Sequence, residues 1–98
     1  MMDADSEFLH RELTGDILAA AFEVHNTLGC GLLEKVYENG LLHELMIRGH
    51  RVVPQRGFSV RYKDRDVGTY FADLVVDESV VVEVKAVEGL ADSHRAQL

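Results

Sequence analysis

Residues 71–85 have the sequence FADLVVDESVVVEVK, in which two apolar runs flank a short polar segment. The second run is nearly pure valine, a composition typical of a β-strand that is covered on both faces. Glu83 and Lys85 interrupt it two residues apart, so both side chains lie on the same face of the strand. The first run carries one charged residue, Asp73. The pattern predicts two strands joined by a turn, at residues 67–76 and 80–87.

The length of the turn decides where Asp73 lies relative to Glu83. If residues 77–79 form a loop of three residues, Val76 pairs with Val80. Asp73 then falls directly opposite Glu83, with the two Cβ atoms about 4.5–5.5 Å apart. A loop of two residues would place the two carboxylates on different faces.

Two adjacent carboxylates repel each other, and removing each from water is costly unless a partner compensates the charge. A divalent cation is the natural compensation, because Mg²⁺ binds one or two carboxylates together with waters and substrate phosphate. The backbone carbonyl of Val84 would supply another oxygen ligand. Lys85 would stand beside the metal-bound water, where it lowers the pKa of that water or stabilises charge on the phosphorus centre.

A second interpretation of the same residues needs no metal. Alternate valines of the 80–84 run would face the core, and the charged residues would face water. Asp73 and Glu83 would then pair with Lys85 or Arg61. An Asp followed about ten residues later by Glu-x-Lys often arises by chance, so the spacing alone favours this second interpretation.

The rest of the chain predicts two helices, a further strand and a last helix. Apolar positions recur at helical spacing over residues 9–28, and a glycine-rich turn ends that helix. A second helical pattern covers residues 33–48, and the β-rich segment 52–62 follows it. A last helix is expected to open near residues 91–93. The predicted order is ααβββα, an α+β arrangement in which an N-terminal helical hairpin packs on a sheet.

The composition is that of an ordinary globular domain, with 47% apolar and 28% charged residues. No stretch approaches the roughly 20 apolar residues of a membrane helix, and the acidic N-terminus is unlike a secretory signal. The lone cysteine, Cys30, has no internal disulfide partner. We therefore expect a soluble cytoplasmic protein with one domain, residues 9–98, preceded by a flexible acidic tail, residues 1–8.

The net charge of −7 argues against a nucleic-acid partner, but residues 48–65 hold six basic side chains and one acidic one. Phosphate binding depends on the local potential and not on the total charge. The candidate contacts to nucleic-acid phosphates are Arg51, Arg56, Arg61 and Lys63. A solvated hairpin that its basic side chains keep soluble explains the segment equally well.

Residues 31–37 read GLLEKVY, and further blocks accompany them in order. These blocks lie at residues 20–25, 37–38, 41–45, 49, 55, 60–63, 73–76, 82–87 and 96–98. Together they resemble the GxxExxY proteins, a branch of the PD-(D/E)XK nuclease superfamily. The resemblance extends over nearly the whole chain from about Leu13.

This resemblance implies a restriction-endonuclease-like core with a mixed sheet, and a nuclease that hydrolyses DNA with Mg²⁺ or Mn²⁺. Asp73 and Glu83 would bind the metal, and Lys85 would be the catalytic lysine. Glu34 would be the first-motif carboxylate, projecting from the second helix towards the metal. Gln97 would lie on the helix that follows the catalytic strand.

Members of the family usually continue past the segment at residues 96–98 through another strand and a final helix. This chain stops at Leu98, so a truncated domain that lacks those elements is expected. The valine-rich strand would then have a free edge, which favours a homodimer or other self-association. The missing elements and the acidic net charge favour an alternative function, a catalytically inactive nuclease-like domain that binds nucleic acid or a protein.

Overall fold

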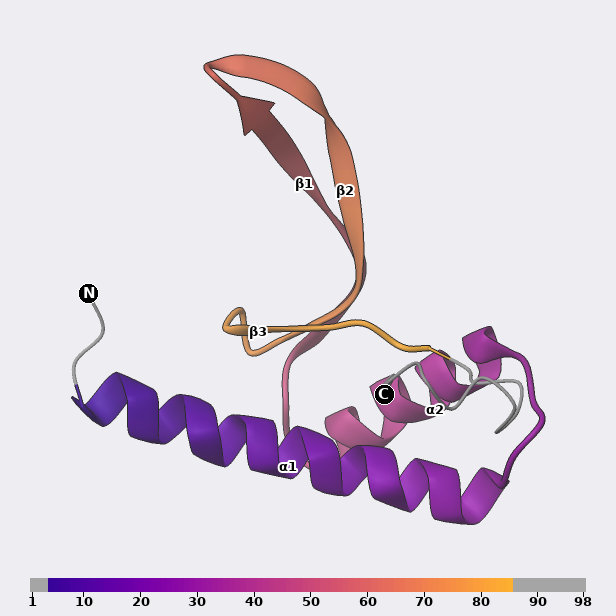
Figure 1. Ribbon diagram of the computed structural model, residues 1–98. Helices are drawn as coiled ribbons and strands as arrows, with labels where there is room; N and C mark the ends of the chain where they lie inside the picture. The colour runs from indigo at the N-terminus through magenta and orange to yellow at the C-terminus, as the bar shows by residue number, and fades with distance from the viewer. Residues whose placement is uncertain (1–3, 86–98) are drawn as a thin grey trace, which may run out of the picture.

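The computed structural model of the protein describes residues 4–85. Its elements are α1 (Ala4–Leu28), α2 (Glu34–Ile47), β1 (Val52–Tyr62), β2 (Arg65–Val76) and β3 (Val80–Val82). The two helices lie on one side of the three-stranded sheet, and the β1–β2 hairpin rises away from them (Figure 1). The predicted α+β class is confirmed. The predicted helix near residues 91–93 lies outside the described residues.

The first helix is longer than its apolar pattern suggests. α1 begins at Ala4, whereas the periodicity places its start at Leu9. Residues 4–8 are therefore helical, although the sequence predicts a flexible tail there. No helix in residues 4–85 combines the length and the apolar character of a membrane span.

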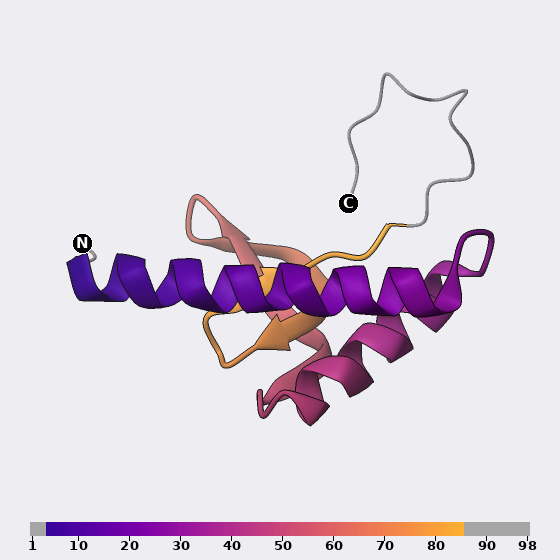
Figure 2. The ribbon, with the colours of Figure 1, turned by 90° about the horizontal axis from the view of Figure 1, so that it is seen from below.

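A short loop joins the helices, and Tyr37 fixes its shape. The chain leaves α1 at Gly29, whose φ of +79° is a conformation that glycine adopts without steric cost. The Tyr37 hydroxyl donates a hydrogen bond to the Gly29 carbonyl (2.5 Å) and accepts one from the Leu32 N–H (3.2 Å). Seen from below, α2 runs at an angle to α1, and both helices cover the base of the sheet (Figure 2).

The sheet has the strand order β1-β2-β3, and every strand pair in residues 4–85 is antiparallel. Val76 pairs with Val80 and Leu74 with Val82, so the turn at residues 77–79 has three residues. The predicted register is therefore confirmed. β3 ends at Val82 and is shorter than the sequence predicts. One reason is that the Val84 N–H donates to the side chain of Asp73 and not to a carbonyl of β2.

The core lies between the helices and one face of the sheet. Its buried side chains come from α1, α2 and β2: Ile17, Ala20, Val24, Leu41, Leu45, Leu74 and Val76. Val80, Val82 and Val84 pack against this cluster from the edge of the sheet. Residues of opposite parity on the same strands therefore point away from this core.

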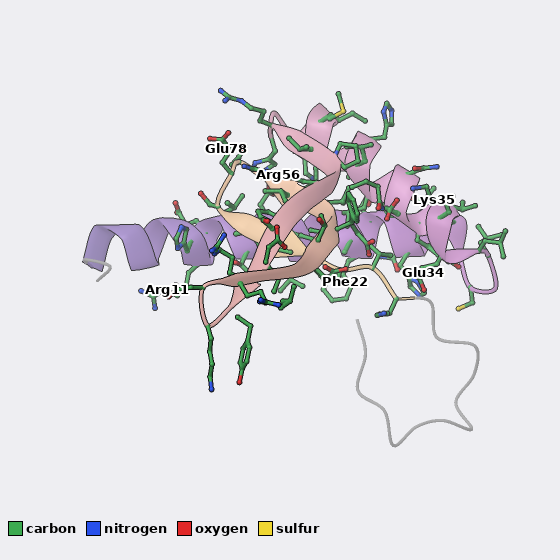
Figure 3. The ribbon with its side chains drawn as sticks, turned by 90° about the horizontal axis from the view of Figure 1, so that it is seen from above. Arg11, Phe22, Glu34, Lys35, Arg56 and Glu78 are labelled. Carbon is green, nitrogen blue, oxygen red and sulfur yellow. The ribbon has the colours of Figure 1, made fainter. Side chains whose placement is uncertain are left out.

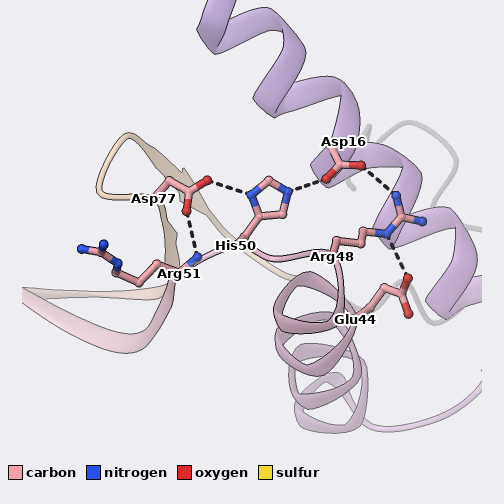
Figure 4. A network of polar contacts seen from close by, with 6 residues as sticks. All are labelled: Asp16, Glu44, Arg48, His50, Arg51 and Asp77. Atoms are coloured by element: carbon pink, nitrogen blue, oxygen red, sulfur yellow. Dashed lines mark hydrogen bonds and ion pairs between the residues drawn. The ribbon is translucent and has the colours of Figure 1, made fainter.

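A polar network links the helices to the β2–β3 turn (Figure 4). The His50 imidazole lies between two carboxylates: its Nδ1 is 2.7 Å from Asp77 Oδ2, and its Nε2 contacts Asp16 on α1. The Arg48 guanidinium joins Asp16 (2.8 Å) to Glu44 (2.9 Å). These contacts connect three segments that are distant in the sequence.

The contacts in this network shift the pKa values of its residues. The hydrogen bonds to Asp16 and Asp77 raise the pKa of His50 above its ordinary 6.5. The hydrogen bond with His50 lowers the pKa of Asp16. The Arg51 N–H, which donates to Asp77 Oδ1 (2.8 Å), is the main cause that lowers the pKa of Asp77. These three pKa shifts favour a protonated His50 between two ionised carboxylates.

Candidate active site

Asp73 lies on β2 between two fully buried residues, and its own side chain is half-buried. The Val84 N–H donates to Asp73 Oδ2 (2.8 Å), which fixes the orientation of the carboxylate. Because Leu74 pairs with Val82, the next step of the register places Asp73 across from Glu83.

Three other side chains reach Asp73. Burial raises the pKa of Asp73, but hydrogen bonds from the Val84 N–H and with the side chains of Glu83, Gln55 and Glu38 outweigh burial. The resulting pKa lies below the ordinary value of 3.8. The lowered pKa keeps Asp73 ionised near neutral pH, with the carboxyl groups of Glu83 and Glu38 close to it.

Gln55 occupies a bend in β1 beside Asp73. The β1–β2 register passes from the Pro54–Leu74 pair to the Arg56–Ala72 pair without pairing Gln55. Gln55 has a φ of +51°, a left-handed conformation that is uncommon for a residue other than glycine. Local irregularities of this kind redirect side chains and are frequent beside active sites. Here the Gln55 amide Nε2 donates to Glu38 Oε1 (3.1 Å).

Glu38 brings a carboxylate from α2 to the sheet. Its exposed fraction is 6%, and it shares a helix face with the core residues Leu41 and Leu45. Burial of a charged group is costly unless it is paired and hydrogen-bonded. Lys35 Nζ lies 2.5 Å from Glu38 Oε2, and Gln55 binds the other oxygen. The 38-41-45 spacing, which puts a carboxylate on an apolar face, is the sequence signal that identifies Glu38.

Glu83 and Lys85 follow β3, and both side chains are exposed. The Tyr70 hydroxyl of β2 donates to Glu83 Oε1, and this hydrogen bond raises the pKa of Tyr70. Lys85 is the last described residue. Sequence reasoning did not identify Tyr70, because its contact with Glu83 depends on how the two strands twist together.

The other predicted site residues are placed as follows. Glu34 is the first residue of α2 and is exposed, one helical turn before Glu38 (Figure 3). The side chain of Val84 packs on the core, and its N–H faces Asp73. Gln97 lies outside the described residues.

The four predicted phosphate-binding residues do not form one surface. Arg51 lies before β1, where its N–H binds Asp77. Arg56 stacks on the ring of Phe58 (5.2 Å to the centroid). Arg61 and Lys63 lie at the far end of the β1–β2 hairpin, because β1 is an extended strand of 11 residues. The basic segment of the sequence is thus spread along the hairpin.

The interpretation that needs no metal predicts correctly which face of the strand is exposed. Its predicted ion pairs with Lys85 or Arg61 are wrong. Alternate valines do pack on the core, and Glu83 and Lys85 are exposed. Within residues 4–85, however, neither Lys85 nor Arg61 forms an ion pair with Asp73 or Glu83. The Val84 N–H, which donates to Asp73 Oδ2, takes that place for Asp73.

A model of the PD-(D/E)XK nuclease superfamily matches residues 11–98. The chain belongs to this superfamily. Comparisons with curated proteins and with solved structures give no match. Nucleases of the PD-(D/E)XK superfamily act on nucleic acids and generally depend on a divalent metal ion.

The donor atoms around Asp73 fit such an ion. Asp73, Glu83 and Glu38 offer carboxylate oxygens, which Mg²⁺ and Mn²⁺ prefer. Within the described part of the chain, no group of three or more acidic, histidine or cysteine side chains is placed to hold a metal ion. Mg²⁺ does not require three such ligands, because it keeps several waters and usually binds one or two carboxylates.

Proposed function

We propose that this domain is a metal-dependent nuclease that hydrolyses phosphodiester bonds in DNA, with Asp73 and Glu83 as ligands of Mg²⁺ or Mn²⁺. The carrying observation is that the β2–β3 register places the half-buried Asp73, held by the Val84 N–H, across from Glu83, with Glu38 of α2 bound to Gln55 nearby. Neighbouring carboxylates repel each other, and a divalent cation bound between them would offset that repulsion.

The bound metal supplies a Lewis acid for the phosphate and lowers the pKa of a water nucleophile. The residues of the chain hold the carboxylates that would bind the metal in position. The Val84 N–H holds Asp73 in one orientation, and Gln55 does the same for Glu38. Lys85, two residues after Glu83, places an ammonium group beside the site to stabilise the negative charge that develops on the phosphate oxygens. The carbonyl of Val84 is a further ligand in this proposal.

The proposal predicts cleavage that depends on a divalent metal. We expect the protein to cut labelled DNA in Mg²⁺ or Mn²⁺, to stop when EDTA is added, and to resume when metal is restored in excess. Gel electrophoresis of the products measures this. The alternative, a catalytically inactive binding domain, is favoured by the net charge of −7. That alternative predicts DNA binding without cleavage in either metal.

Glu38 replaces Glu34 in our proposal as the third carboxylate, because Glu38 is buried and is bound by Gln55, which lies beside Asp73. Glu38→Gln should raise the metal concentration that gives half-maximal cleavage by about 10-fold or more. Glu34→Gln, one turn away on the same helix, is the matched control and should change it less than about 2-fold. A larger effect of Glu34→Gln would indicate that Glu34 takes part in metal binding.

Three finer assignments belong to the same proposal. The block at residues 31–37 supports membership of the GxxExxY branch. We also propose a cytoplasmic location. Self-association is proposed at the outer edge of β3 (Val80–Val82), which is made only of valine and is an edge strand among residues 4–85. Unpaired backbone groups along an apolar strand favour pairing with a second copy. Light scattering at micromolar concentration should give the mass of a dimer, and a monomer would contradict this assignment.

A further inference from the structure

The distal part of the β1–β2 hairpin, residues 56–71, forms an arm that leaves the body of the protein (Figure 1). Every side chain from residue 59 to residue 71 is exposed, and burial on β2 begins only at Ala72. A two-stranded ribbon that buries neither face gains little stability in water. Both faces of the arm are therefore available for contact with a partner.

The arm is basic although the chain is acidic. It holds four basic residues (Arg56, Arg61, Lys63 and Arg65) and two acidic ones, in a chain with a net charge of −7. One of the acids, Asp66, is engaged within the arm, where it accepts hydrogen bonds from the Gly68 N–H (3.0 Å) and the Ser59 hydroxyl (3.2 Å). A local positive potential on a protruding element attracts a polyanion.

The turn at the tip of the arm has a lysine at a position where asparagine would give a more stable turn. Lys63 and Asp64 have φ angles of +48° and +64°, the conformation of a type I′ turn. Asn-Gly is the preferred pair for that turn, and lysine is an unusual residue at positive φ. The tip nevertheless presents Lys63, with its ammonium 5.4 Å from the centre of the Tyr62 ring. Arg61 steadies the turn by donating to the Asp64 carbonyl (2.6 Å).

The dimensions of the arm fit a DNA groove. Paired strands lie about 4.8 Å apart, and the major groove, about 12 Å wide, admits a two-stranded ribbon. The same strand that forms the arm carries the candidate site, since Tyr70 binds Glu83 and Asp73 lies three residues further along β2. The eight residue-to-residue steps from Arg65 to Asp73 span about 26 Å at 3.3 Å per step. That length corresponds to about eight base-pair steps of 3.4 Å.

We propose that the hairpin arm enters the major groove of double-stranded DNA and contacts its phosphates with Lys63 and Arg65. The contact lies about eight base pairs from the phosphodiester held at Asp73. The position of that scissile bond rests on the proposed nuclease function, whereas the binding of duplex by the arm does not. A single strand is better served by a basic groove with stacking platforms, and the arm is a projection. A protein partner would have to desolvate the charged tip.

Binding is measured by fluorescence anisotropy with a labelled duplex of about two helical turns, over a range of salt concentrations. All proteins carry Asp73→Asn, so that the duplex stays intact. The test variant adds Lys63→Asn and Arg65→Gln, because asparagine tolerates positive φ. The control adds Arg11→Gln, which removes one exposed positive charge from α1. Thermal melting confirms that each protein is folded, and Lys63→Asn alone serves if the double change impairs folding.

We expect the slope of log K against log salt to decrease in magnitude by about 1.8 for the double variant and by about 0.9 for Lys63→Asn. Arg11→Gln should leave it unchanged. On duplexes shorter than about eight base pairs, the double variant and its parent should bind equally. An unchanged slope, an equal effect of Arg11→Gln, or tighter binding of single strands would each overturn the proposal.

The nuclease proposal and the arm proposal can be contradicted independently of each other. If arm-dependent binding is observed but the wild-type protein cuts no DNA in any metal, the nuclease assignment fails and the arm proposal stands. If the wild-type protein cuts DNA and the arm variants bind and cut duplex as well as the wild type does, only the arm proposal fails.

Discussion

Asp73→Asn is expected to lower the rate of metal-dependent DNA cleavage on the order of 10³-fold. Asparagine has nearly the same shape as aspartate, and its carbonyl oxygen retains an acceptor for the Val84 N–H. What the variant loses is the negative charge and one metal-binding oxygen. The fold should persist, because the half-buried side chain keeps its size and its main hydrogen bond.

The rate is measured under single-turnover conditions with the DNA saturated by protein, so that weaker binding does not lower it. The matched control is Glu78→Gln, which removes an exposed carboxylate from the neighbouring β2–β3 turn. That control should retain the wild-type rate within about 2-fold. If Asp73→Asn retains more than about a tenth of the wild-type rate, Asp73 does not bind the catalytic metal.

His50→Gln is expected to lower the free energy of unfolding by about 1–2 kcal/mol near pH 5.5 and much less near pH 9. The figure is modest because the Asp16 and Asp77 side chains are each 37% exposed and therefore partly screened. The folded-state pKa of His50 is raised, so its contribution is complete below the ordinary value of 6.5. The contribution is lost as the pH rises through the raised pKa, because the neutral ring donates only one hydrogen bond.

At low pH, protonation of Asp16 and Asp77 removes the stabilisation that the contacts with His50 provide. The pKa values of Asp16 and Asp77 are lowered, so their contribution is complete above the ordinary value of 3.8 and is lost as the pH falls through the lowered values. The network is thus most stabilising between about pH 4 and pH 6.5. Urea denaturation at several pH values measures this, with His43→Gln on the exposed face of α2 as the control. Equal destabilisation by His50→Gln at pH 5.5 and pH 9 would contradict the protonated form of His50.

The sequence predicts the sheet well because local patterns determine it. The three-residue turn and the alternating valines allow only one pairing that buries Leu74 and Val76, and that pairing is present. β1 has the bounds that its β-rich composition predicts. The same register places Asp73 beside Glu83, so the centre of the candidate site follows from the sequence.

Contacts between distant segments are not evident from local patterns. Glu38 reaches Asp73 because β1 bends at Gln55, and nothing in the sequence indicates a positive φ for that glutamine. The family signature directs attention to Glu34 instead. The His50 network joins positions 16, 48, 50 and 77, whose proximity depends on how the helices pack on the sheet. The basic segment is local in the sequence, but the extended strand separates Arg51 from the arm.

Isothermal titration with Mn²⁺ tests most directly whether the cluster around Asp73 binds a metal. The wild-type protein should release or absorb heat on binding, and Asp73→Asn and Glu83→Gln should each abolish that heat. A wild-type protein that gives no binding heat, or variants that bind Mn²⁺ as the wild type does, would contradict the account.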